Sequence, residues 1–275
     1  MAKAMKKAAS TELAATTDAF GALAGMGMEN VGASDLLVPR LTILQALSPQ
    51  LKRNKAEFID SAEEGVICDV GLGELFPDGI LFIPVFYRKD YIEWAPRSTG
   101  KGLVQIHSDP SVLDDCQRDD KNRPIRDNGN YIAETAQFFG INLTAGGRKS
   151  YVAMASTQLK KARRWNTYAT GEKLSRPDGS SFTPPLFYRS YKLTTGEEEN
   201  SEGSWYGWKI ERGPTLPELA GEEHVDVGAP FQQMLGDCKT FLEGLVSGSI
   251  KADTSQLDES GSADSDTIDG EAEVM

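Results

Sequence analysis

The stretch Ile80–Trp94, ILFIPVFYRKDYIEW, constrains the fold more than any other part of the sequence. It is dense in β-branched and aromatic residues, which favour an extended strand over a helix. Because side chains alternate between the two faces of a strand, one face is expected to carry Val85, Tyr87, Lys89 and Tyr91, and the other Phe82, Phe86, Arg88 and Ile92. A chain organised around so long a strand is expected to be mainly β.

Further β segments lie on both sides of this strand. Gly65–Phe76 alternates apolar and polar residues and predicts a first strand, and the turn Pro77–Gly79 follows it. Two hairpins are predicted, Gln137–Leu143 with Lys149–Ala155 and Pro185–Leu193 with Ser204–Arg212. With a helix between the hairpins, the order is that of the OB fold, a small and partly open five-stranded barrel. We therefore expect a mainly β, OB-fold-like barrel with helices, although other β-rich α+β folds satisfy the same pattern.

The helix between the hairpins belongs to the segment Tyr151–Ala169, YVAMASTQLKKARRWNTYA, which reads as a short buried strand running into a basic helix. Ser156 or Thr157 can cap the helix start. At 100° per residue, one arc carries Leu159, Ala162 and Trp165, the opposite arc carries Lys160, Lys161, Arg164 and Tyr168, and Arg163 lies near the apolar edge. Such a concentration of cations indicates either a solvated helix face or an anion-binding face.

Composition changes divide the chain into three parts. Residues 1–33 are rich in Ala, Gly, Thr and Met and predict a flexible arm. Residues 34–247 form the predicted domain, with a turn-rich insertion loop at 95–131 and an amphipathic helix at 229–246. Residues 248–275 predict a disordered acidic tail. The net charge of −12 falls to −4 without the eight carboxylates that follow Lys251, so the acidity is concentrated in this tail.

The cysteines and the N-terminus bear on the compartment. Cys68, Cys116 and Cys238 are far apart and lack any CxxC spacing, which argues against disulfides and a structural zinc site and favours buried free thiols. No apolar signal region or membrane-spanning segment is expected, because TELAATTDAF follows the basic start. We expect a protein of the cytoplasm with no membrane partner.

Catalytic signals are weak. His107 and His224 lie in unrelated loops, and the sequence contains no GxSxG, GxxxxGK[ST] or strand-linked GxGxxG motif. The carboxylates of the insertion loop do not have the spacing of a calcium loop; they are Asp109, Asp114, Asp115, Asp119 and Asp120. We therefore expect no enzyme activity, no cofactor and no metal, and keep a metal-dependent nuclease using these carboxylates as the least favoured alternative.

Binding of single-stranded nucleic acid needs cations for phosphates and exposed rings for stacking bases. The two residue types are interleaved in FYRKDYIEW, KKARRWNTY, FYRSYK and WYGWK. Each single ring is more often a core residue, but four such segments together favour a binding surface. The candidate nucleic-acid-binding residues are Tyr87, Lys89, Tyr91, Lys160, Lys161, Arg163, Arg164, Trp165, Tyr168, Arg189, Tyr191, Lys192, Trp205, Trp208 and Lys209.

Three features together resemble bacteriophage single-stranded DNA-binding proteins of the replication and recombination module: PRLTILQALSPQ, the barrel-like middle with STQLKKARRWNT, and the acidic end. The resemblance covers residues from Asp35 to the C-terminus. It implies an OB-fold core, sequence-independent binding of single-stranded DNA, and a tail that contacts replication or recombination proteins. Such tails often finish with an aromatic residue, whereas this chain finishes Glu273, Val274, Met275.

The acidic tail fits this function, because a tethered polyanion competes with nucleic acid for a cationic groove. We therefore expect single-stranded DNA binding in phage replication, recombination or repair, with an autoinhibitory or recruiting tail. The alternative from another class is a virion or host-enzyme-inhibiting protein that mimics nucleic acid. The sequence leaves a homodimer open.

Overall fold

The structure is a computed structural model that describes residues 23, 26–32, 35–96, 99, 102–120, 122–200, 203–221 and 231–254. By their contacts, the residues form two units, Met1–Leu36 and Leu37–Met275. Most of the predicted arm, 1–33, and residues 255–275 of the predicted tail lie outside the described residues. All elements below belong to the second unit.

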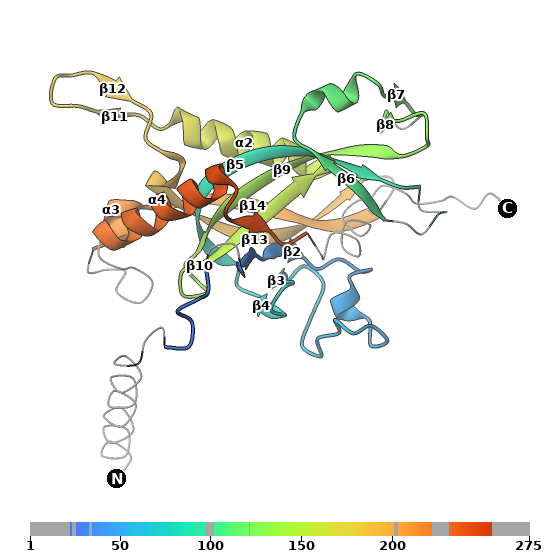
Figure 1. The fold of residues 1–275 in the computed structure, drawn as a ribbon, viewed down its shortest axis with the longest axis horizontal. Helices are drawn as coiled ribbons and strands as arrows, with labels where there is room; N and C mark the ends of the chain where they lie inside the picture. The colour runs from blue at the N-terminus through green and yellow to red at the C-terminus, as the bar shows by residue number, and fades with distance from the viewer. Residues whose placement is uncertain are drawn as a thin grey trace, which may run out of the picture. The chain divides into compact units, whose positions relative to one another are not determined.

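The second unit is built on an 11-stranded mixed sheet with the path β14-β13-β5-β9-β10-β2-β3-β4 (Figure 1). Its strands are β2 (Arg40–Ile43), β3 (Ile67–Asp69), β4 (Glu74–Phe76), β5 (Ile80–Trp94), β6 (Leu103–His107), β7 (Gln117–Arg118), β8 (Pro124–Ile125), β9 (Tyr131–Asn142), β10 (Arg148–Ala155), β13 (Arg189–Asn200) and β14 (Gly203–Thr215). Two smaller sheets pair β1 (Leu37–Val38) with β15 (Lys251–Ala252) and β11 (Leu174–Ser175) with β12 (Ser181–Phe182).

The helices lie between and against these strands. The α-helices are α2 (Leu159–Gly171), α3 (Leu216–Leu219) and α4 (Phe231–Ser247). The 3-10 turns are η2 (Pro49–Leu51), η4 (Pro110–Leu113), η5 (Ser156–Gln158) and η6 (Leu186–Tyr188). Ser156 has a positive φ of 49°, and no side chain caps η5 or α2. The cap predicted from Ser156 or Thr157 is therefore wrong.

The predicted strand order is confirmed. β5 pairs with β9 on one side and β13 on the other, β9 continues to β10, and α2 joins β10 to the β13–β14 hairpin. The sheet curls into a half-barrel (Figure 1). This mostly β arrangement is consistent with an OB-like barrel in which β5, β9, β10, β13 and β14 are the five strands.

A β-bulge between Pro84 and Phe86 changes which residues of β5 share a face. Proline has no N–H for the ladder, and a bulge inserts one extra residue into a strand. Phe82 and Tyr87 therefore both pack on the inner cluster, while Val85 and Phe86 both pack on the outer one. The strict alternation predicted along β5 is wrong at this point.

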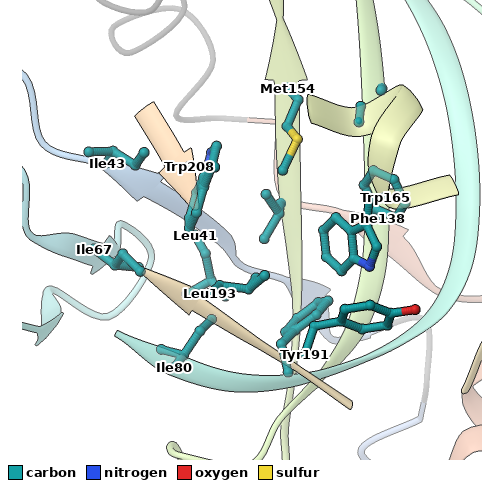
Figure 2. Packing of buried hydrophobic residues seen from close by; sticks show 14 of the residues in the cluster. Leu41, Ile43, Ile67, Ile80, Phe138, Met154, Trp165, Tyr191, Leu193 and Trp208 are labelled. Carbon is teal, nitrogen blue, oxygen red and sulfur yellow. The ribbon is translucent and has the colours of Figure 1, made fainter. Parts of the chain in front are cut away.

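The inner cluster fills the half-barrel. Figure 2 shows members of this cluster, with Trp165 contributed by α2. The members contributed by the strands include Leu41, Ile67, Ile80, Phe138, Met154, Tyr191, Leu193 and Trp208. The Trp165 ring stacks on Phe138 at a centroid distance of 4.0 Å and meets Phe82 and Tyr191 edge-on. Burial of these large rings fixes α2 against the sheet.

The outer cluster lies on the other side of the sheet and is covered by α4. Met234, Cys238 and Phe241 of α4 pack with Phe139, Ile141 and Tyr151 of the sheet, which confirms the predicted apolar stripe, although Phe231 at the helix start is 36% exposed. Cys68 and Cys238 are buried free thiols as expected, whereas Cys116 is half-buried.

Five further segments differ from what was predicted. Gly65–Phe76 forms two short strands, β3 and β4, because a turn at residues 70–73 interrupts it. The acidic run Glu197–Glu199 continues β13. Helix α3, which follows Pro214, was not predicted, and it begins with a Thr215–Glu218 capping box. Lys251–Ala252, at the predicted tail start, pairs with β1. The insertion 95–131 also contributes strands, β6 to β8.

Side-chain amides close the seam beside β14, the strand at one end of the sheet path. Gln45 Nε2 donates to the Tyr206 carbonyl oxygen at 2.7 Å, and its Oε1 accepts from the Tyr206 N–H at 3.0 Å. Gln158 Oε1 accepts from the Trp208 N–H at 3.1 Å. These amides replace part of a strand ladder, because unpaired buried backbone groups are costly.

Replacing Gln45 with alanine is expected to lower the free energy of unfolding by about 1–3 kcal/mol, because two backbone groups of Tyr206 lose their partner. Urea denaturation measures the change. Gln105→Ala is the matched control, since Gln105 is exposed on β6, and it should stay within about 0.5 kcal/mol. Equal stability of the two variants would contradict this account of the seam.

Candidate nucleic-acid interface

Helix α2 positions most of the predicted cations. Ala162 and Trp165 form the buried side of this helix, so the opposite arc of the helix faces outward. Lys160, Arg163 and Arg164 are exposed, whereas Lys161 is half-buried. The amphipathic arrangement predicted for this helix is confirmed.

Arg164, Tyr168 and Arg212 form a compact group at the C-terminal half of α2. The Arg164 guanidinium lies 5.3 Å from the Tyr168 ring centroid, and its Nε donates to the Tyr168 hydroxyl at 2.5 Å. The Arg212 guanidinium lies 5.2 Å from the same centroid and donates to the Tyr168 carbonyl oxygen at 3.2 Å. We call Lys160, Arg163, Arg164, Tyr168 and Arg212 the α2 surface.

Arg212 was not predicted from the sequence. It is exposed on β14 and lies 44 positions from Tyr168 in the chain, so no local pattern connects the two residues. One phenol ring orders two guanidinium groups that retain further N–H donors. Such a pair is suited to an anion such as a phosphodiester.

Other predicted cations form ion pairs. Glu134 accepts from Lys89 Nζ at 2.8 Å and lies 3.9 Å from Arg163. Lys161 pairs with Glu198, whose other oxygen accepts from the Trp205 indole N–H at 3.1 Å. Glu172 binds Arg189 through two N–H donors at 2.6 and 3.0 Å, and these hydrogen bonds lower the pKa of Glu172. Their charges are therefore partly compensated within the protein.

The remaining predicted residues are divided between the core and a separate exposed face. Tyr91, Trp165, Tyr191 and Trp208 are buried, and Trp165 is 0% exposed. Trp205, another of the rings predicted to stack on bases, is also buried. Tyr91, Tyr191 and Trp208 are directed inward by strand alternation, whereas Trp165 is buried on the inner side of helix α2. Tyr87 is half-buried against Phe138. Lys192 and Lys209 are exposed, each beside an inward-facing aromatic residue on its strand.

A polar face on the outside of the sheet was also missed. Arg88, Gln137 and Ala153 are neighbours across β5, β9 and β10, and Asp90, Thr135 and Ala155 form the next row. Arg88 donates to Gln137 Oε1 at 3.0 Å and pairs with Asp90 at 2.9 Å. Burial raises the pKa of Asp90, and Arg88 partly offsets that shift. We call these six residues the outer sheet face.

The outer sheet face leads to two other features. Ala153 and Ala155 line a small pocket of about 30 Å³ together with Thr42 and the buried Trp205. Arg40 of β2 pairs with Tyr151 of β10, one row away, and the Tyr151 hydroxyl donates to the Asp253 carbonyl oxygen at 2.9 Å. Burial raises the pKa of Tyr151 to about 12. The described chain therefore reaches Asp253 beside this face.

A family model described as "Pam3 phage gp34-like protein" matches residues 6–233. The chain belongs to this family. It is thus a phage protein, as the sequence resemblance suggested. No curated protein and no solved structure matches the chain.

In the insertion 95–131, two of the acidic residues accept hydrogen bonds from neighbouring residues of the chain. Asp109 accepts from the Ser111 N–H at the start of η4, and Asp119 accepts from Arg123. Within the described residues, no group of three or more His, Cys, Asp or Glu side chains could hold a metal ion. The same part of the chain contains no helix long and apolar enough to cross a membrane.

Glu93 holds the insertion to β5. It accepts from Asn130 at 2.6 Å, and from Arg126 and His107 Nε2 at 3.0 and 2.9 Å. Burial alone would raise the pKa of Glu93, but these hydrogen bonds outweigh burial and lower it to about 2. Both carboxylate oxygens of Glu93 have partners from the insertion. The buried charge of Glu93 therefore serves to hold the insertion in place.

Proposed function

We propose that this phage protein binds single-stranded DNA without sequence specificity and acts in phage DNA replication, recombination or repair. The observation that carries the proposal is the α2 surface, where Arg164 and Arg212 converge on Tyr168 beside exposed Lys160 and Arg163. Cations aligned along a groove bind the phosphates of a single strand, and binding releases condensed counterions. No covalent chemistry is required.

The outer sheet face gives the proposal a second support. In OB folds, oligonucleotides bind over the second and third strands of the barrel, which correspond to β9 and β10 here. Asp90, Thr135 and Gln137 of this face are buried, so Arg88 is the polar group that a bound strand would contact there. Ala153 and Ala155 have small side chains that leave room beside it. Most rings predicted to stack bases are buried. Contacts to the phosphates of the bound strand therefore carry more of the proposed binding than the sequence suggested.

The acidic tail is proposed to regulate this binding. The chain reaches Asp253 near Tyr151 and the outer sheet face, and seven further carboxylates follow in the sequence. Tethered anions have a high effective concentration near a cationic site and are displaced by nucleic acid. Once displaced, the tail is available to replication or recombination proteins. Removal of residues 255–275 is the direct way to expose this competition.

Fluorescence anisotropy with a labelled oligothymidine and with a duplex, each at about 50 and 200 mM salt, tests the proposed function. We expect tighter binding of the single strand and a steep loss of affinity at the higher salt concentration. Equal affinity for both nucleic acids would remove the single-strand claim. No binding by either the full chain or the tail-truncated chain would favour the alternative, a protein-interaction role.

A further inference from the structure

The β11–β12 hairpin leaves the barrel directly after α2 and projects from it in Figure 1. We call residues 172–183 the arm; this segment is distinct from the N-terminal arm predicted at residues 1–33. Its two strands form a sheet of their own, separate from the 11-stranded sheet. Most of its residues are exposed, including Lys173 and Arg176. An isolated two-stranded hairpin is at best marginally stable in water. The arm therefore depends on additional contacts to keep its shape.

Three sets of contacts hold the arm in shape. At its base, Glu172 binds Arg189 of β13, and Lys173 donates to Thr183. At its tip, Asp178 Oδ1 accepts from the N–H and the hydroxyl of Ser180 at 2.8 and 2.6 Å. Gly179 takes a positive φ of 85° in this turn, where glycine is favoured. These contacts connect the base and the tip of the arm and define its hairpin shape.

The middle of the arm combines a cation with a ring. The Arg176 guanidinium lies 4.5 Å from the centroid of the half-buried Phe182 ring. Lys173 and Arg176 are exposed, and the one carboxylate near the tip, Asp178, is engaged by Ser180. Exposed cations beside a ring are the chemistry that binds phosphate and stacks a base.

We infer that the arm is a second contact for single-stranded nucleic acid, in which Arg176 binds phosphate and Phe182 stacks a base; this rests on the proposed function. The arm continues the α2 surface. Arg164 and Gly171 are about 10 Å apart along the helix axis, and the five residues from Gly171 to Arg176 span at most about 18 Å. One strand longer than a few nucleotides therefore bridges both contacts.

Chain-length dependence of binding tests the arm. Site sizes on OB folds are about 4–16 nucleotides, so oligothymidines of about 4 and about 20 nucleotides separate one contact from two. Arg176→Ala and Phe182→Ala should each weaken binding of the long oligonucleotide at least about fivefold and leave the short one unchanged. Lys55→Ala, which removes an exposed cation elsewhere, is the matched control.

A fluorescent variant reports contact directly. The native tryptophans Trp94, Trp165, Trp205 and Trp208 are all buried, so Phe182→Trp adds a more accessible indole whose emission should be quenched by the long oligonucleotide. If the wild type binds both lengths but the arm variants match Lys55→Ala and the emission of the Phe182→Trp variant does not change, the arm inference fails and the proposed function stands. If the wild type binds neither length, the proposed function itself fails.

Discussion

Replacing Trp165 with alanine is expected to lower the free energy of unfolding by about 3–5 kcal/mol. The ring is 0% exposed and contacts Phe138, Phe82 and Tyr191 inside the half-barrel. Its removal leaves a cavity where α2 meets the sheet, and neighbouring strands cannot collapse fully into it. Urea denaturation followed by circular dichroism measures the loss.

The neighbouring residue supplies the control for this prediction. Arg164→Ala changes an exposed side chain on the same helix and should alter the free energy of unfolding by less than about 1 kcal/mol. The two variants should therefore separate stability from binding. A Trp165→Ala protein with wild-type stability but no oligonucleotide binding would show that the tryptophan stacks on bases, contrary to its buried position.

The double variant Arg164→Ala with Arg212→Ala should weaken oligothymidine binding about 10- to 100-fold at low salt, because each guanidinium is proposed to bind a phosphate. Loss of two phosphate contacts should also reduce the slope of log affinity against log salt by about 1.4. Anisotropy titrations at several salt concentrations measure both quantities. Tyr168→Phe should give a smaller loss, since it removes the hydroxyl that orients Arg164 but keeps the ring.

The matched control is Lys55→Ala with Lys239→Ala, which removes the same charge from exposed positions outside the α2 surface. Both double variants should have near-wild-type circular dichroism spectra. A control that loses as much affinity as the arginine variant would show that net charge, and not the geometry around Tyr168, governs binding. In that case the α2 surface would no longer be the proposed interface.

Local patterns predicted the elements whose faces differ clearly in polarity. The β-rich run Ile80–Trp94 became β5, and the alternation of Ala162 and Trp165 with cations predicted how α2 is oriented. The stripe on α4 likewise identified its packing face. These predictions succeed because strand and helix periodicity are properties of neighbouring residues.

The surface on which the proposed function rests could not be predicted in the same way. Alternation along β14 predicts that Trp208 and Lys209 point in opposite directions, but it does not say which direction is the core. The bulge at Pro84 reverses the phase of β5, and Arg212 reaches Tyr168 across 44 positions.

The order of residues was thus sufficient to specify a mainly β chain with a cationic helix and an acidic end. The folded arrangement was needed to show that the rings of Trp165 and Tyr191 fill the barrel and that Arg164 and Arg212 converge on one phenol ring. The physical reason is that burial depends on which face of each strand is covered. Contacts between residues far apart in the chain set that coverage, and local periodicity does not contain them.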